Sequence, residues 1–264
     1  MKIILCIKQV PETSSVRIDE QTGAIVREGV ENIVNPLDLY AIEVALQLKE
    51  THGGHVTAVS MGPKHTGKAV REALAMGCDA GILISDGKLA GSDTYATSYA
   101  LSSAIARLAP FDLIITGERA TDGDTGQVGP GIASFLRLPL STYTSRIVSL
   151  DAGYATVERL IENGYETLRL PLPCLLTVVK EIAHPRLPTL RGKQRARRTE
   201  LTVWTADDLK LDESRVGLQG SPTRVVKVEK PQVARKGKIL DVAKVGVREA
   251  ARELADFLAE RNLL

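Results

Sequence analysis

Three features are scarce or missing in this 264-residue chain, and each excludes a class of protein. Its three cysteines, Cys6, Cys78 and Cys174, lie far apart without a CxxC pair, which argues against a disulfide framework or a structural zinc site. No apolar run approaches the roughly 20 residues of a transmembrane helix. The formal charge is only +2, from 34 basic and 32 acidic residues, so the strong positive field of a nucleic-acid-binding protein is absent.

Aromatic side chains are also few, with three Phe, six Tyr and one Trp. A bound ring system would therefore be held mainly by backbone and small polar groups. The N-terminal sequence MKIILCIKQVPE has an apolar run too short for a secretory signal and no small-residue cleavage site. Together with the cysteine pattern, this makes a reducing, cytoplasmic compartment the expected location.

Short runs of β-branched residues alternate with helical patterns over roughly the first 140 residues. Asn35 is a good N-cap for the first helix, and Pro36 suits its first position. The alternation predicts an α/β fold with a doubly wound, mostly parallel sheet of the adenine-nucleotide-binding, Rossmann-like type. We expect strands at 2–7, 55–60, 80–85 and 111–116, and further helices over 64–76 and 93–108.

From about residue 140 to 180 the apolar period changes to two, and Asn163-Gly164 separates two alternating runs. Asn-Gly in that position is a strong hairpin signal, so an antiparallel extension of the sheet is expected, followed by a strand over 174–179. A small hairpin is expected around Gln21, Thr22 and Gly23.

The domain organisation predicted from the sequence pattern is an α/β domain of the adenine-nucleotide-binding type over 1–216, then a linker and C-terminal helical arm over 217–264. In the arm, apolar residues from Val247 to Leu258 share one helical face. That face would pack on the chain's own domain or on another subunit, and the pattern leaves both open.

The strongest candidate for a binding site is the glycine-rich stretch GERATDGDTGQVGPG at 117–131, which follows an expected strand and precedes a helix expected near Ile132. Ligands of open parallel sheets bind at the carboxyl ends of the strands, and free N–H groups entering a helix suit an anion. Asp122 and Asp124 would repel a phosphate, so we expect them to accept hydrogen bonds from ribose hydroxyls or to cap the helix. A turn-rich loop without a ligand is the alternative.

Two other segments lie at the same edge of the expected sheet. GPKHTGKA at 62–69 approaches a P-loop, but Ala69 replaces the Mg²⁺-binding hydroxyl and Pro63 removes a backbone donor, which argues against an ATPase or kinase. GSDTYAT at 91–97 opens a helix with Ser92 as the expected N-cap and with Thr94 and Thr97 on one side. Helix capping alone explains this second motif equally well.

Catalytic and metal-binding patterns are missing from the sequence. None of its four histidines has metal-ligand spacing, and GxSxG, HExxH and GxGxxG do not occur. We assign no catalytic residue and no metal ligand. The pattern is typical of a nucleotide-binding protein without bond-making chemistry of its own.

Several motifs, in order along residues 1 to about 200, resemble the beta subunit of electron-transfer flavoprotein. They are IKQVP (7–11), NPLDLYAIEVAL (35–46), AVSMGP (58–63), REALAMGCD (71–79), GERATDGDTGQVGP (117–130), ETLRLPLP (166–173) and PRLPTLRG (185–192). Glu12, Arg119 and Cys78 depart from the more usual Asp, Gln and Ala, and none of these changes removes a motif's backbone role.

The resemblance implies a heterodimer with an alpha subunit that carries a redox-active FAD. It also implies an adenine nucleotide in this subunit, which is AMP in ordinary members. In electron-bifurcating members it is the AMP half of a second FAD, which accepts a hydride from NADH. The 91–97 segment resembles the bifurcating subgroup and favours FAD. A subunit with structural AMP that docks a dehydrogenase is one alternative, and a stand-alone nucleotide hydrolase is another.

The resemblance also implies roles for individual residues. Cys6 and Met61 would present backbone to the adenine, and Gly62 would also belong to the cofactor site. Thr94 and Thr97 would meet the flavin-side phosphate and ribityl region. Leu187 or Leu190 would anchor a flavin-dependent dehydrogenase, such as an acyl-CoA dehydrogenase. The adenosine would be lined by Asn35, Pro36, Leu37 and Asp38, and the ribose and phosphate would be wrapped by Asp122, Gly123, Asp124, Thr125, Gly126, Gln127, Val128, Gly129, Pro130 and Ala133.

A basic stretch surrounds the expected docking loop. Residues 184–198 carry six basic side chains and no acid. A solvated loop and helix start explains such a run, and contact with a phosphate or an acidic partner is the other interpretation. The six are Arg186, Arg191, Lys193, Arg195, Arg197 and Arg198.

Overall fold

The computed structural model describes residues 1–12, 17–18, 25–26, 31–151, 153–226 and 239–263. They form two compact units, Met1–Arg224 and Val225–Leu264. The second unit contains α6 (Val242–Val245) and α7 (Val247–Ala259). The fold and the candidate site described below belong to the first unit.

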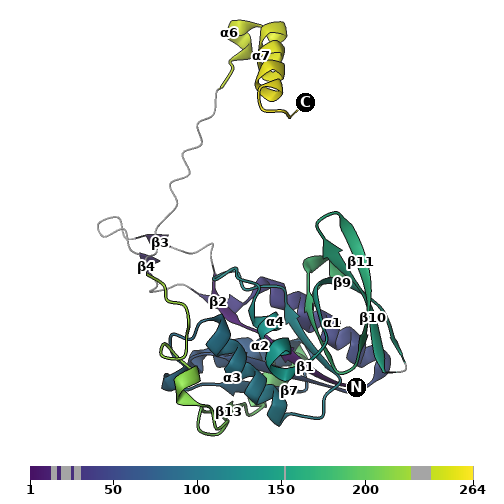
Figure 1. The fold of residues 1–264 in the computed structure, drawn as a ribbon, viewed down its shortest axis with the longest axis vertical. Helices are drawn as coiled ribbons and strands as arrows, with labels where there is room; N and C mark the ends of the chain where they lie inside the picture. Colours follow the sequence, from purple (N-terminus) through teal and green to yellow (C-terminus); the bar gives the residue numbers. More distant parts are fainter. Residues whose placement is uncertain (13–16, 19–24, 27–30, 152, 227–238, 264) are drawn as a thin grey trace. The chain divides into compact units, whose positions relative to one another are not determined.

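A nine-stranded sheet is the centre of the first unit, in the order β11-β10-β9-β12-β8-β1-β6-β7-β13 (Figure 1). Neighbours from β9 to β13 in this order pair in parallel, whereas β10 pairs antiparallel with β9 and β11. The predicted α/β fold with an antiparallel extension is therefore confirmed. The strands are β1 (Lys2–Cys6), β6 (His55–Met61), β7 (Ala80–Ile84), β8 (Leu113–Gly117), β9 (Leu140–Asp151), β10 (Tyr154–Ile161), β11 (Gly164–Pro171), β12 (Cys174–Val178) and β13 (Thr202–Trp204).

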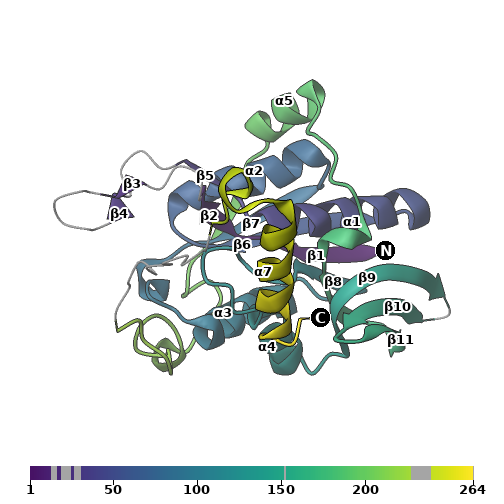
Figure 2. The same ribbon diagram turned by 90° about the horizontal axis from the view of Figure 1, so that it is seen from above.

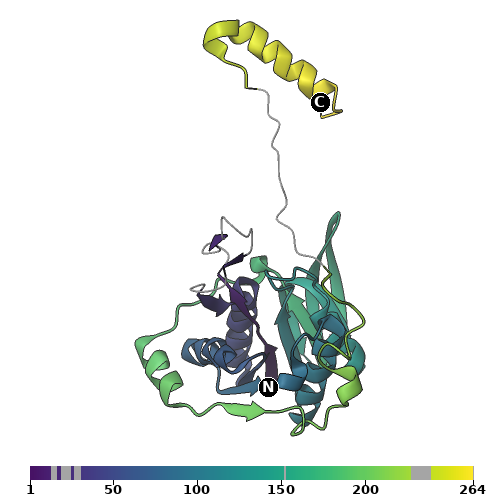
Figure 3. The ribbon, with the colours of Figure 1, turned by 90° about the vertical axis from the view of Figure 1, so that its left-hand side faces the viewer.

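Helices cover both faces of this sheet. Figure 2 shows α1 (Pro36–His52), α2 (Gly67–Met76) and α5 (Leu190–Arg198) on one side, and α3 (Thr94–Arg107) and α4 (Val128–Leu136) on the other. Figure 3 shows the same layers from another side. Because successive strand residues point to opposite faces, Ile3 and Leu5 of β1 pack in the α1/α2 core, while Ile4 packs in the α3/α4 core.

Short elements complete the fold. β2 (Gln9–Pro11) pairs with β5 (Asn32–Val34), and β3 (Arg17–Ile18) pairs with β4 (Ile25–Val26), as a hairpin requires. The turn predicted at Gln21, Thr22 and Gly23 lies outside the described residues. Single 3-10 turns are found at Lys64–Thr66, Gly87–Leu89, Lys180–Ile182 and Glu213–Arg215.

Two helix starts differ from the sequence-based prediction. Asp93, not Ser92, caps α3, because its carboxylate accepts the N–H groups of Tyr95 and Ala96. The Ser92 hydroxyl instead donates to the Leu89 carbonyl. Helix α4 begins at Val128, one turn earlier than the expected start near Ile132, so more of the glycine-rich segment is helical.

The order of the strands places a switch point beside β1. From β1 the chain passes through α1, β6, α2 and β7 in one direction, and then returns through α3 to β8 on the other side of β1. In such a sheet the helices diverge at the switch point and leave a crevice at the carboxyl ends of the strands. Those ends are Cys6 of β1 and Gly117 of β8.

Candidate functional site

A cavity of about 360 Å³ lies at this switch point, which is within the size range of small-molecule sites. None of the described residues that line it is aromatic, so its surface consists of backbone, hydroxyl, charged and aliphatic groups. The lining residues are Cys6, Ile7, Lys8, Asp38, Met61, Ser92, Asp93, Thr94, Thr97, Leu101, Thr116, Gly117, Glu118, Arg119, Ala120, Gly123, Asp124, Thr125, Gly126, Gln127, Val128 and Gly129.

The glycine-rich segment forms one wall of the cavity. Asp124 and Gly126 have φ values of 54° and 63°, a left-handed conformation that turns the chain back toward the start of α4. The first N–H groups of α4 have no partner within the helix, and Val128 and Gly129 at that end line the cavity. This wall therefore offers the backbone donors that an anion needs.

Asn35 holds this wall in place from the other side of the switch point. Its side chain is buried and does not line the cavity. The Asn35 Nδ2 group donates to the Arg119 carbonyl at 2.9 Å, and Oδ1 accepts the Thr121 N–H at 3.1 Å. Although Asn35 directly precedes α1, its side chain makes no capping hydrogen bond there. Both ends of the amide are used to fix the glycine-rich loop.

Ion pairs engage both aspartates of the loop. Lys8 Nζ lies 2.7 Å from Asp122, and Arg119 Nε lies 3.2 Å from Asp124. Lys8, Arg119 and Asp124 line the cavity, whereas Asp122 lies outside its lining. Two cations at the cavity wall offset the carboxylates that would otherwise repel a phosphate.

The first turn of α3 forms another part of the cavity wall. Thr94 Oγ1 donates to Gln127 Oε1 at 2.8 Å, which joins α3 to the start of α4. Thr97, one turn further on, also lines the cavity. The two motifs that the sequence singled out separately, at 91–97 and 117–131, therefore face one cavity.

Buried Asp38 and Cys6 contribute to the cavity wall at the end of β1. Asp38 Oδ2 accepts the Lys8 N–H at 2.7 Å, and a Cβ on Gly117 would collide with Oδ1. Burial raises the pKa of Asp38 to about 7, despite hydrogen bonds from Lys8, Asn35 and Gly117 that lower it. Burial also raises the pKa of the Cys6 thiol to about 12, with Asp38 adding to the effect. This part of the wall carries little charge below neutral pH.

The cavity includes part of the predicted cofactor-binding set. Pro36, Leu37, Gly62, Pro130 and Ala133 lie outside its lining, together with Asn35 and Asp122. Sequence reasoning did not select, as individual site residues, the following residues that do line it: Ile7, Lys8, Ser92, Asp93, Leu101, Thr116, Gly117, Glu118, Arg119 and Ala120. Most of these lie inside the motifs named in the sequence, so taking whole segments would have found them.

The predicted docking segment is held against helices α1 and α2 by arginine contacts. Arg186 Nε donates to Glu43 Oε2 at 2.8 Å, and its Nη2 donates to Glu50 Oε2 at 3.0 Å. Arg195 Nη2 donates to the Leu74 and Cys78 carbonyls at the end of α2. These two cations therefore have structural roles.

Exposed groups remain on the same segment. Leu187 and Leu190 are 87% and 88% exposed, values that are unusual for leucine and suit contact with another protein. Within the part of the chain that the structure describes, four basic side chains here make no ion pair: Arg191, Lys193, Arg197 and Arg198.

Two other features of the described residues limit the kinds of site. No helix among them is long and apolar enough to cross a membrane. No group of three His, Cys, Asp or Glu side chains in the described ranges is arranged to hold a metal ion.

The switch-point cavity, glycine-rich wall and helix starts define an α/β protein with a crevice of the kind that takes nucleotides. Residues 22–209 match the electron transfer flavoprotein domain. Over the whole of both chains, the protein is 44% identical to electron transfer flavoprotein subunit beta of Thermoanaerobacterium thermosaccharolyticum and 40% identical to the caffeyl-CoA reductase-Etf complex subunit CarD of Acetobacterium woodii. It is also 43% identical to FixA of Rhizobium meliloti, over all of this chain and 94% of that protein. The chain therefore belongs to the electron transfer flavoprotein beta subunit family.

The raised pKa of Asp38 predicts a pH-dependent stability. Between about pH 4 and about pH 7, the folded protein retains a proton on Asp38 that the unfolded chain releases, so the free energy of unfolding falls as pH rises. Asp38→Asn should remove this contribution, which is at most about 4 kcal/mol over that range. Urea unfolding at a series of pH values measures the effect.

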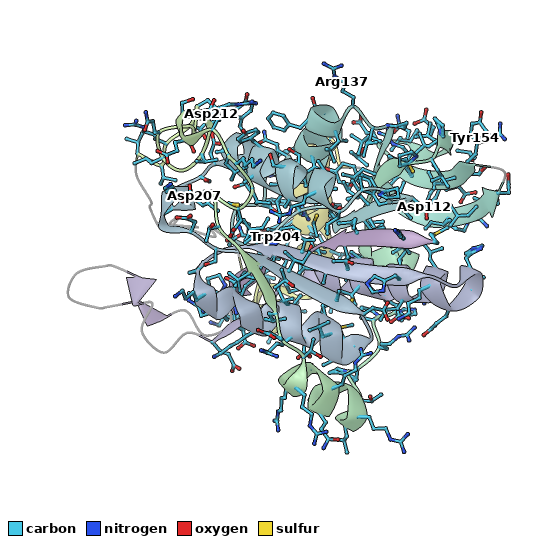
Figure 4. The ribbon with its side chains drawn as sticks, turned by 90° about the horizontal axis from the view of Figure 1, so that it is seen from below. Asp112, Arg137, Tyr154, Trp204, Asp207 and Asp212 are labelled. Atoms are coloured by element: carbon cyan, nitrogen blue, oxygen red, sulfur yellow. The ribbon has the colours of Figure 1, made fainter. Side chains whose placement is uncertain are left out.

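A matched control is Asp112→Asn. Asp112 lies just before β8 (Figure 4), and its carboxylate also accepts a backbone N–H, that of Lys2, at 2.7 Å. In this variant the free energy of unfolding should still fall as pH rises, as in the wild type. Parallel curves for wild type and Asp38→Asn would show that Asp38 does not titrate in this range.

Proposed function

We propose that this chain binds FAD at the switch-point cavity as the acceptor of a hydride from NADH. The electrons taken from NADH would then pass to the FAD of an alpha subunit and to a partner dehydrogenase. We propose that this transfer includes flavin-based electron bifurcation. The observation that carries the proposal is that the 91–97 and 117–131 segments face one cavity, joined by the Thr94–Gln127 hydrogen bond. Similarity to a subunit of a caffeyl-CoA reductase-Etf complex supports it.

The residues present fit the nucleotide part of FAD. Backbone N–H groups at the start of α4 and the cations of Lys8 and Arg119 suit the phosphates, and the hydroxyls of Thr94 and Thr97 extend the site along α3. When bound, FAD would supply the hydride and single-electron chemistry. The chain's own residues would bind and orient it.

The second candidate function is a subunit with structural AMP that docks a dehydrogenase without bifurcation. The observation in its favour is the cavity itself, which at about 360 Å³ suits a mononucleotide. In the bifurcating case the same cavity would hold the AMP half of FAD.

Counting the flavins decides between these candidates. The heterodimer, made by co-expression with its alpha subunit, should contain two FAD, identified by mass spectrometry and absorbance after denaturation. NADH should then reduce one of them directly. One FAD with one AMP would contradict the bifurcating function and support the second candidate, and no nucleotide beyond the alpha-subunit FAD would contradict both.

The docking proposal is tested by two single substitutions, Leu187→Ala and Leu190→Ala. We expect one of them to raise the KM for an oxidised acyl-CoA dehydrogenase, as electron acceptor, about tenfold or more, because a central apolar anchor contributes much of an interface's affinity. Since both side chains are exposed, the free energy of unfolding should not change. Each variant is the other's control, and two variants with unchanged KM would contradict docking here.

A further inference from the structure

Residues 217–223, here called the strap, are fastened across the start of α3. The Gly217 N–H donates to Ser92 Oγ at 3.0 Å, and the Asp93 N–H donates to Ser221 Oγ at 2.8 Å. Gly217 has a φ of 62°, and a Cβ there would collide with the Lys88 carbonyl oxygen. The strap therefore fits closely over the loop that leads into α3.

Asp93 connects the strap to the helix through its two carboxylate oxygens. Oδ1 accepts the N–H groups of Tyr95 and Ala96, both at 3.0 Å, and so caps α3. Oδ2 accepts the N–H and the hydroxyl of Thr223, at 3.0 and 2.8 Å. A single carboxylate thus starts the helix and holds the end of the strap.

The same carboxylate belongs to a residue of the cavity wall. Ser92, Asp93 and Thr94 line the cavity, whereas no residue of the strap does. A negative group beside a nucleotide phosphate is unfavourable unless its charge is stabilised by donors. Four hydrogen bonds do this for Asp93: although burial raises its pKa, those from Ala96, Thr223 and Tyr95 bring it below the usual value.

We propose that Ser221 and Thr223 are positioning residues for nucleotide binding, acting through Asp93 on the α3 wall of the cavity. This rests on the proposed function, in which that cavity binds an adenine nucleotide. Since the strap and the nucleotide favour the same arrangement of residues 92–94, binding should stabilise the strap, and the strap should strengthen binding to the same extent.

The test uses the purified heterodimer, freed of exchangeable nucleotide, with AMP as the probe. Hydrogen–deuterium exchange is measured for peptides covering 217–223 and 117–131, with and without saturating AMP. In the wild type, AMP should slow exchange in both peptides, although only the second lines the cavity.

Thr223→Val removes the hydroxyl while keeping the size of the side chain. It should weaken AMP binding about tenfold, the usual effect of losing a hydrogen bond to a charged group. It should also abolish the effect of AMP on the strap peptide. Thr223→Ser should restore both, and Ser221→Ala should act like Thr223→Val. Ser214→Ala is the control, because its hydroxyl bonds to Asp212 instead of residues 91–93.

Slower exchange at 117–131 without any change at the strap in the wild type would overturn this proposal and leave the proposed function intact. Unchanged AMP affinity in both Thr223→Val and Ser221→Ala would overturn it as well. If AMP slows exchange in neither peptide, the nucleotide function itself fails, and this proposal with it.

Discussion

The buried amide of Asn35 is the interaction on which the candidate site depends. At the switch point the helices that follow β1 and β8 lie on opposite faces of the sheet, so no ladder of backbone hydrogen bonds holds the glycine-rich loop beside the end of β1. The Asn35 side chain closes this gap with one donor and one acceptor, to Arg119 and Thr121. Since its backbone N–H also donates to the Lys8 carbonyl, one residue fixes both sides of the crevice.

The charges around the crevice follow from the same arrangement. Lys8 leaves β1 beside Asn35 and reaches Asp122 on the loop, while its backbone N–H satisfies buried Asp38. The exposed Lys8–Asp122 pair adds little stability by itself, so the neutral amide provides the more dependable link. With few aromatic residues in the chain, recognition of a nucleotide must rely on these backbone and polar contacts.

Two of the aromatic side chains, Trp204 on β13 and Tyr154 on β10 (Figure 4), instead stack under the guanidinium groups of Arg107 and Arg169.

The sequence predicted the strands, the first helix and the glycine-rich loop, because each has a local pattern of β-branched runs, caps or glycines. It did not reveal the hydrogen bonds from Asn35 to the loop, since an Asn before Pro36 looks the same whether it caps a helix or bonds a loop more than eighty residues away. Ser92 and Asp93 are equally good caps on local grounds, and contacts with residues 217–223 distinguish them. Likewise, the basic run gave no sign that Arg186 and Arg195 bind their own domain, because their partners are distant in the chain.

The most direct test of the account is the affinity of the heterodimer for AMP, measured by equilibrium dialysis. The variants compared with the wild type are Asn35→Ala and, as a control, Asn32→Ala on β5. Asn32 is exposed, so the control should bind AMP like the wild type. Asn35→Ala should weaken binding by about 1–3 kcal/mol, because two buried backbone groups of the loop lose their partner. Equal AMP affinity in Asn35→Ala and wild type would contradict the claim that this amide holds a nucleotide site together.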